Sequence, residues 1–479
     1  ADLRRFQTGQ LVSAHAYSVR ELLGRFLHRH RAEVLVAAVL SLVVVAAVAA
    51  GFVAVRRQAR VAEAERDRAE RINDFLVGML GSVDPRVAGG DISVAAMLDG
   101  ASARVVEELG GEPAVMAEVL TTLGTTYQGL GLLAPATARL EEALAAARLA
   151  YGPEHVVVAR ALDRLAGAAE DEGEHREAER LGREALAMLQ RLGEGGGAEA
   201  AQVTGNLARV LKWLGETEEA ERRYREALEI QRRLPGDNRA LVAATVNNLG
   251  VLLGERGDWA GAAPLIREAV ELVRAVRGSE HPEVAAGLST LGAVLEESGD
   301  LAGAEASYRE SLAMRERLLG PEHPDTARSL YALAGLQQAH GNPEGALESC
   351  RRILALRGEV LPEGHPLVAA ALHITGLSLL DLARPAEAEP ALREALALRR
   401  AALPQGHWLV ASSQGALGAA LTALGRFTEA EALLLEAERG LTAARGPEHA
   451  RSVEARRRLA ELYEAWGRPE QAASWRAPK

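Results

Sequence analysis

Cysteine, aromatic residues and lysine are all scarce in this chain of 479 residues. The single cysteine, Cys350, rules out an internal disulfide framework and does not indicate a cellular compartment. Aromatic residues make up only 4% of the sequence although 48% of it is hydrophobic. Alanine is abundant instead, as close packing of helices requires. The basic residues are almost all arginine, a bias that hints at a GC-rich bacterial genome.

The motifs of the large enzyme classes are missing as well. The chain has no glycine-rich phosphate loop after a strand, no Val-Ala-Ile-Lys, no His-Arg-Asp and no Asp-Phe-Gly. It has neither a Gly-x-Ser-x-Gly elbow nor a His-Glu-x-x-His metal motif. Residues 129–134 match a dinucleotide fingerprint only superficially, because no strand precedes them. We therefore predict that this chain is not an enzyme and holds no cofactor or metal.

The charge distribution argues against one class of partner. The formal net charge is −11, whereas the first 71 residues are net basic, so the acidic charge is concentrated in the rest of the chain. Nucleic-acid binding through a broad basic face is therefore not expected.

What the sequence does contain is a repeat of 42 residues, from about Pro113 to the C-terminus. Three of its positions are kept over nine periods without an insertion. The first holds only glycine or alanine: Gly124, Ala166, Ala208, Gly250, Gly292, Ala334, Gly376, Gly418 and Ala460. The second lies seven residues later: Gly131, Gly173, Gly215, Gly257, Gly299, Gly341, Ala383, Gly425 and Gly467. The third lies twelve residues after the first: Ala136, Ala178, Ala220, Ala262, Ala304, Ala346, Ala388, Ala430 and Ala472. Such a period indicates a solenoid of stacked units.

Each repeat reads as a pair of helices. Val246, Leu249, Gly250 and Leu253 follow the i, i+3, i+4, i+7 spacing of one apolar helix stripe. The small residue at the first position lets the second helix approach closely. The glycine at the second position ends the first helix, because glycine reaches the left-handed C-terminal cap without a Cβ penalty.

Small residues where two helices meet are typical of tetratricopeptide repeats, which this region resembles. The motif's Leu-Gly/Ala pair stands, for example, at 249–250 and 333–334. The long period and the Gly-Pro-Glu-His link at 152–155, 320–323 and 446–449 are similar to the variant of kinesin light chains and many bacterial proteins. The resemblance implies an all-α, tetratricopeptide-type right-handed helical solenoid over residues 113–475, with eight full units and a partial ninth.

Six histidines also follow the repeat: His155, His281, His323, His365, His407 and His449. Equivalent positions in successive units should lie on the order of 10 Å apart, given helix packing distances of ~8–10 Å. Metal ligands must all lie within ~2.1 Å of one ion. We therefore predict that these histidines are linker residues that bond the exposed backbone near a helix start.

The segment before the repeats contains a long apolar run. Val34 to Val55 are 22 consecutive uncharged residues, which as a helix would span ~33 Å and cross a ~30 Å hydrocarbon core. The sequence thus predicts a transmembrane helix over residues 33–56, in contact with the lipid bilayer, in a single-pass membrane protein. Residues 57–112 are expected to form juxtamembrane and capping helices; a parallel coiled coil at 56–80 is the alternative.

Residues 1–32 resemble the remnant of another domain. Asp2-Leu3-Arg4-Arg5-Phe6, the later Gly9 and a basic stretch are similar to the end of the catalytic lobe in bacterial transmembrane serine/threonine kinases. The resemblance implies a kinase upstream, a cytoplasmic N-terminal segment and an extracytoplasmic repeat region that serves as sensor or scaffold. A homodimer would fit such a receptor. The alternative is a membrane-tethered assembly scaffold without a kinase.

The resemblance also implies where a partner binds. In tetratricopeptide proteins that hold peptides, the first helix of each unit lines a concave groove through positions six, three and two residues before the Gly/Ala position and one after it. The expected peptide-binding residues are Arg160, Arg164, Gln202, Asn206, Arg209, Asn247, Asn248, Arg328, Tyr331 and His373, with Asp163 beside them. Amide side chains suit a peptide backbone and arginine suits a carboxylate. The alternative is that these are ordinary solvated residues.

Overall fold

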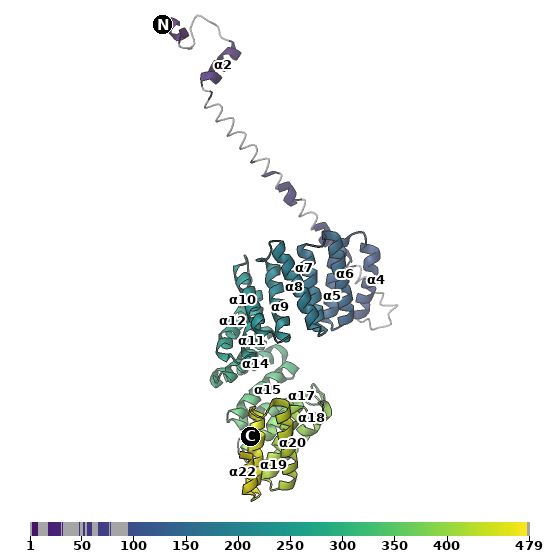
Figure 1. Cartoon of the computed structure of the whole chain (residues 1–479), viewed down its shortest axis with the longest axis vertical. Helices are drawn as coiled ribbons and strands as arrows, with labels where there is room; N and C mark the ends of the chain where they lie inside the picture. Colours follow the sequence, from purple (N-terminus) through teal and green to yellow (C-terminus); the bar gives the residue numbers. More distant parts are fainter. Residues whose placement is uncertain are drawn as a thin grey trace. The chain divides into compact units, whose positions relative to one another are not determined.

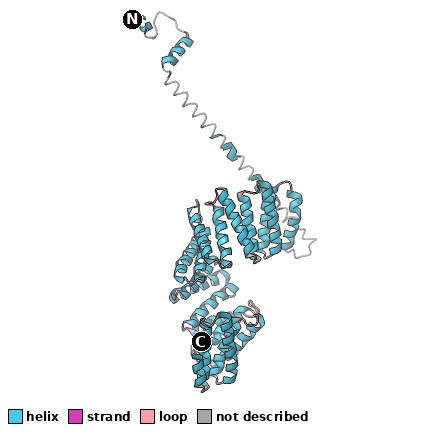
Figure 2. Ribbon diagram, viewed as in Figure 1, coloured by secondary structure: helices cyan, strands magenta, loops and turns pink. Residues whose placement is uncertain are grey.

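The chain is helical in nearly all the residues that the structure describes. The computed structural model describes residues 94–476 without a gap and, before them, 2–7, 18–29, 55–59, 66–75, 31, 47, 51, 52 and 77. These residues form helices and short connections, with one isolated bridge between Arg357 and Leu361 and no strand (Figure 2). The predicted all-α class is confirmed.

The chain divides into two compact units, Ala1–Gly152 and Pro153–Lys479, and most of their helices are labelled in Figure 1. The first unit contains α1 (Asp2–Gln7), α2 (Val19–Arg29), α4 (Val94–Leu109), α5 (Pro113–Gly129) and α6 (Leu133–Tyr151). The second contains α7 (Val156–Asp171), α8 (His175–Arg191), α9 (Ala198–Trp213), α10 (Thr217–Arg233), α11 (Arg239–Glu255), α12 (Trp259–Arg277), α13 (Pro282–Glu297), α14 (Leu301–Leu319), α15 (Pro324–Ala339), α16 (Pro343–Ala355), α17 (Pro366–Asp381), α18 (Pro385–Ala402), α19 (Trp408–Ala423), α20 (Phe427–Arg445), α21 (Ala450–Ala465) and α22 (Pro469–Arg476).

In the first unit, α4 and the segment around Phe75 cover the first helix pair. Phe75, Leu98 and Val105 are buried in one cluster with the apolar faces of α5 and α6. Two apolar side chains of α4, Val94 and Val106, are exposed instead. The buried positions are Leu98, Ala101, Val105 and Leu109, which the helical period places on one side.

Close approach within each helix pair depends on the Gly/Ala position. A Cβ on Gly250 would lie 2.6 Å from Ile266 Cδ1, and one on Gly376 would lie 2.3 Å from Leu392 Cγ. The third repeat position faces the same interface: all nine of its alanines, from Ala136 to Ala472, are at most 1% exposed. Each unit therefore packs as the repeat predicts, helix against helix with small side chains between.

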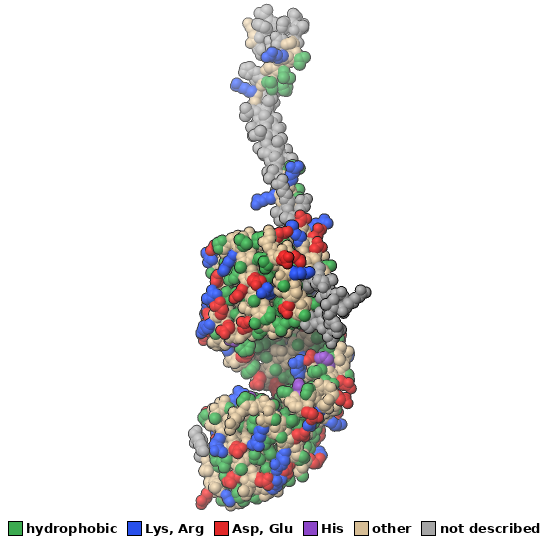
Figure 3. All heavy atoms as spheres, turned by 90° about the vertical axis from the view of Figure 1, so that its right-hand side faces the viewer, with side chains coloured by type: hydrophobic (Ala, Val, Ile, Leu, Met, Phe, Trp, Pro, Cys, Tyr) green, Lys and Arg blue, Asp and Glu red, His purple; other side chains and the backbone are tan. Residues whose placement is uncertain are grey.

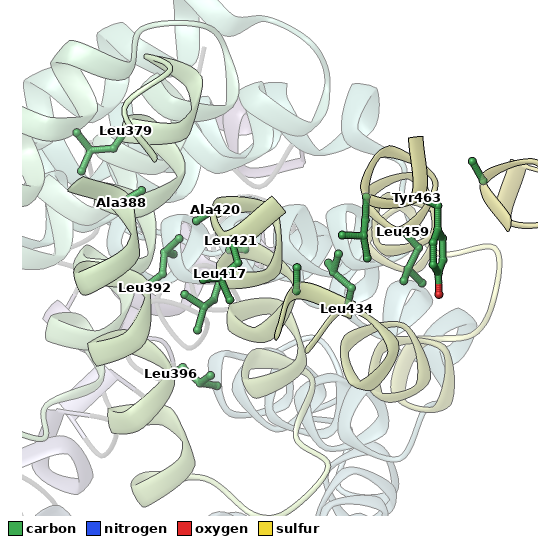
Figure 4. Packing of buried hydrophobic residues seen from close by; sticks show 14 residues of the cluster. Leu379, Ala388, Leu392, Leu396, Leu417, Ala420, Leu421, Leu434, Leu459 and Tyr463 are labelled. Atoms are coloured by element: carbon green, nitrogen blue, oxygen red, sulfur yellow. The ribbon is translucent and has the colours of Figure 1, made fainter. Parts of the chain in front are cut away.

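The interior of the last units shows how the pairs stack (Figure 4). Leu392 and Leu396 of α18, Leu417 and Leu421 of α19 and Leu434 of α20 lie in one buried cluster. The cluster continues to Leu459 and Tyr463 of α21. Each helix pair thus buries its apolar face on the next, as expected of a solenoid in which units contact their neighbours.

The connections also follow the sequence. The glycines of the second repeat position all have positive φ, between 73° and 87°, and so does Ala383 at 56°. The six periodic histidines precede α7, α13, α15, α17, α19 and α21, and the Nδ1 of each accepts the backbone N–H two residues later. The prediction that they bond the backbone at helix starts is confirmed.

The predicted membrane segment is not supported. Within the described residues, no helix is both long and apolar enough to cross a bilayer. This finding corrects the transmembrane helix placed before the solenoid and the assignment as a single-pass membrane protein. The prediction followed hydrophobicity over residues 33–56 alone, and nearly all of these lie outside the described residues.

Candidate functional site

Within residues 153–479, the first helices of successive repeats lie side by side. Helix α7 contacts α9, α15 contacts α17, and α17 contacts α19, which in turn contacts α21. Helix α9 also contacts α11 and α13 contacts α15, whereas α11 and α13 line a common groove. We call the surface made by the four groove positions on α7, α9, α11, α13, α15, α17, α19 and α21 the first-helix face.

At α7 and α9, the predicted residues are bound to one another. Asn206 Nδ2 donates to both carboxylate oxygens of Asp163 at 3.0 Å. Arg209 pairs with Glu170 at 2.8 Å, and Arg160 pairs with Glu199. These contacts join neighbouring repeats, so the hydrogen-bonding groups of these side chains are already used within the solenoid.

Asp163 is the buried centre of this network. It is only 4% exposed, and burial raises its pKa, against the lowering effects of the Asn206 hydrogen bond and of Arg164 and Arg209. Arg164 is half-buried beside it, and Gln202 is half-buried one unit further along. A ligand here would have to displace existing bonds.

A groove opens where the first-helix face passes from α11 to α13. Its volume is about 470 Å³. Asn247 and Asn248 line it, and neither side-chain amide has a hydrogen-bond partner among the described residues. The floor and walls consist mainly of small apolar residues: Ala240, Ala243, Ala244, Ala269, Val270, Val273, Val276, Ala286 and Gly287. Thr290 lines it at the position that Asn248 occupies one unit earlier.

The packing of α12 on α13 shapes this groove. A Cβ on Gly287 would lie 2.9 Å from Val270 Cγ2, so the Val270 side chain packs directly on the α13 backbone at Gly287. At the rim, Arg277 Nε lies 3.4 Å from Glu283 Oε2. The result is an apolar trough with two unengaged amides on one wall and an ion pair at its edge.

The remaining predicted residues lie further along the face. Arg328 pairs with Asp325 in its own helix, and Tyr331 is 40% exposed. His373 is 8% exposed, and its Nδ1 has no hydrogen-bond partner. Burial lowers the pKa of His373 well below its ordinary value, and Arg399, Arg458 and Arg451 lower it further. His373 is therefore a buried neutral imidazole and not a solvated groove residue.

Three residues near His373 were missed at the sequence level. Ser412, Glu454 and Arg458 line a small pocket with His373. All three occupy groove positions of α19 and α21, so the same offset rule applied to the last two units would have found them.

Comparison with known proteins decides the family. Two sequence profiles described as tetratricopeptide repeat match the chain, one over residues 115–191, 199–275, 242–317, 283–359 and 409–475, the other over 368–409. This chain belongs to the tetratricopeptide repeat family. Proteins of this fold are generally non-catalytic and bind other proteins or peptides. Among the described residues, no group of three or more His, Cys, Asp or Glu side chains could hold a metal ion.

Solved structures agree with the fold. BtubC (BKLC) from P. vanneervenii is 24% identical and matches 48% of this chain and 91% of its own, with a TM-score of 0.42. A putative kinesin light chain from Podosopora anserina is 23% identical over 43% of this tetratricopeptide chain and 98% of its own, with a TM-score of 0.37. The apo form of RapI is 12% identical but matches 82% and 98% of the two chains, with a TM-score of 0.55. No curated protein sequence matches.

Proposed function

We propose that this tetratricopeptide protein holds an extended peptide or protein segment on its first-helix face, centred on the groove between α11 and α13. The observation that carries the proposal is the pair of unengaged amides, Asn247 and Asn248, beside a groove of about 470 Å³. The equivalent Asn206 is already bound to Asp163. Of the three groove asparagines, Asn247 and Asn248 are the two whose side chains have no hydrogen-bond partner among the described residues.

The chemistry of the groove suits a peptide. A side-chain amide offers one acceptor and two donors, so it can bond both the N–H and the C=O of an extended backbone. The small apolar lining leaves room for the side chains of the ligand, which would lose water on entering. We expect a segment with short apolar side chains, since Arg277 and Glu283 narrow the rim through their pairing.

The proposal assigns different roles to two parts of the chain. Residues 57–112 would cap the first repeat, and residues 113–475 would provide the binding surface. The link to a bacterial serine/threonine kinase depends on the resemblance of residues 1–32 and on their position before the repeats, and a kinase-independent assembly scaffold is the alternative. Reading the coding sequence upstream of Ala1 separates the two. Neither a lipid bilayer nor a second copy of the chain is needed by this proposal.

Peptide selection followed by a binding assay tests the groove. Random unphosphorylated peptides are selected on the intact chain from a display library, and fluorescence anisotropy measures their affinity. We expect Asn248→Ala to weaken binding by about tenfold, because a hydrogen bond inside a groove contributes on the order of 1–1.5 kcal/mol. Ala286→Leu, at an exposed position of the groove, should block binding by filling it.

Gln190→Ala is the matched control. Gln190 is an exposed amide on α8, a second helix, and lies outside the first-helix face and the groove. Peptides whose affinity is unchanged by both Asn248→Ala and Ala286→Leu, or is reduced equally by Gln190→Ala, would place the ligand elsewhere and contradict the proposal.

A further inference from the structure

A second and smaller pocket lies on the first-helix face near the C-terminal end. Its volume is about 90 Å³, enough for a group of several heavy atoms. It is built from four helices, and its lining consists of His373 and Leu377 of α17, Ser412 and Gly415 of α19, Leu441 of α20, and Arg451, Glu454, Ala455 and Arg458 of α21. The groove of the proposed function is formed by different helices.

Positive charge exceeds negative charge around this pocket. Glu454 is the acidic residue of the lining, and it already accepts from Arg457 at 2.7 Å and from Arg458 at 2.9 Å. Arg451 lines the pocket, and the buried Arg399 lies behind the lining, near enough to His373 to lower its pKa. Neither arginine has a carboxylate partner among the described residues. Arg399 instead donates to the carbonyl of Leu409 and to Ser413 Oγ, which fixes it. Two guanidinium charges thus remain uncompensated by the protein.

A buried nitrogen without a hydrogen-bond partner belongs to one of the residues that line the pocket. His373 lines the pocket, its side chain is 92% buried, and its Nδ1 has no partner among the described residues. A buried polar atom without a hydrogen bond costs free energy, so a ligand that bonded this nitrogen would remove that cost. Burial, together with Arg399, Arg458 and Arg451, lowers the pKa of His373 well below its usual value, so at neutral pH the imidazole can donate one hydrogen bond without adding charge.

We propose that this pocket binds a phosphoryl group carried by the peptide or protein segment on the first-helix face. The inference rests on the proposed function and adds the chemistry of one side chain of the partner. A phosphoryl dianion matches two uncompensated guanidinium charges, whereas a carboxylate carries one charge. The planar guanidinium of Arg451 suits phosphate oxygens. The hydroxyl of Ser412, to which Arg451 Nη1 donates at 3.4 Å, and the N–H of His373 complete the set of donors.

Titration with inorganic phosphate tests the pocket without any peptide. Calorimetry of the full chain at pH 7.5 and constant ionic strength compares sodium phosphate with sodium acetate. We expect phosphate to bind at one site per chain and acetate to bind at least about tenfold more weakly. Arg451→Gln should weaken phosphate binding at least about tenfold, and the exposed position of Arg451 lets this variant keep its fold.

Two controls make the result decisive. Arg393→Gln removes an exposed guanidinium of α18 that pairs with Glu389 and Glu429 away from the pocket, and it should bind phosphate like the parent chain. If Arg451→Gln fails to fold, Ser412→Ala, which removes another donor of the pocket, is titrated with phosphate in its place and should also weaken phosphate binding.

Equal binding of acetate and phosphate, loss of binding in Arg393→Gln, or no binding of either anion would each overturn the proposal. Since unphosphorylated peptides report on the α11–α13 groove, failure here leaves that experiment unaffected.

Discussion

Two recurring residues close the ends of the helices: a histidine before a first helix and a glycine after it. The histidine ring accepts a backbone N–H that would otherwise be unpaired at the helix start, as a serine or aspartate cap would. The glycine fits because its backbone there has positive φ, which costs other residues energy. Ala383 is the one non-glycine residue with positive φ in the part of the chain that the structure describes.

Ala383→Gly should therefore stabilise the unit formed by α17 and α18. A left-handed backbone costs an L-residue roughly 1–2 kcal/mol, and glycine loses part of that gain through its larger unfolded-state entropy. We expect a net gain of about 1 kcal/mol, measured as slower amide hydrogen exchange in α17 and α18.

Gly425→Ala is the reverse change at the equivalent position one unit later, where φ is 75°. It should destabilise α19 and α20 by a similar amount, about 1 kcal/mol. If Ala383→Gly instead accelerated exchange, the positive φ at this position would not be the source of strain.

At the scale of helix pairs, glycine has a different role. Gly376 lies within α17 at ordinary helical angles. A small residue is needed there because the side chain of Leu392 from α18 occupies the space that a Cβ would take. Leu392 is fully buried, so it has no free space into which to move. The same packing recurs at Gly124, Gly250, Gly292 and Gly418.

Gly376→Ala should destabilise the protein by about 1–3 kcal/mol through overpacking. Gly335→Ala is the matched control, since Gly335 also lies inside a helix, α15, but a Cβ there would meet nothing within 4 Å. That variant should gain roughly 0.5–1 kcal/mol, because alanine favours the helix over glycine. Thermal unfolding of the two variants, with opposite shifts in Tm, checks the pair; shifts of the same sign would contradict this account.

The helix pairs could be predicted from sequence because their determinants repeat at fixed spacing. One set of buried polar contacts between units could not, since it involves residues that the 42-residue period does not preserve. Gln231, Arg315 and Arg399 each bond a hydroxyl 14 residues further on, at Thr245, Ser329 and Ser413. They recur in every second unit only, so a search for a 42-residue pattern passes over them.

At the scale of the whole molecule, charge is paired within the solenoid rather than gathered into one area. Acidic and basic side chains are interspersed over the face of the repeats in Figure 3. Many ion pairs join neighbouring units, as between Arg183 and Glu219 at 3.0 Å and between Lys212 and Glu255 at 2.7 Å. The offset rule selects the surface, but it cannot tell engaged side chains such as Asn206 from free ones such as Asn248.

His373 couples the stability of the last units to pH. The ordinary pKa of histidine is 6.5, and in the folded chain burial and the guanidiniums of Arg399, Arg458 and Arg451 hold it well below that value. Glu454 is the one carboxylate that lines the same pocket. Below pH 6.5 the imidazole of His373 therefore binds a proton in the unfolded chain but not in the folded chain.

Stability consequently should fall as pH drops below about 6.5, by up to about 1.4 kcal/mol per pH unit for this one proton, until the folded pKa is reached. Above pH 6.5 both states are neutral at this site and the contribution is constant. His373→Gln should remove this part of the pH dependence, whereas the exposed His340→Gln should keep it. Hydrogen exchange of α17, α19 and α21 between pH 7.5 and 5, corrected for intrinsic rates, measures the difference. Parallel pH profiles for the parent chain and His373→Gln would show that His373 is already protonated, or solvated, in the folded protein.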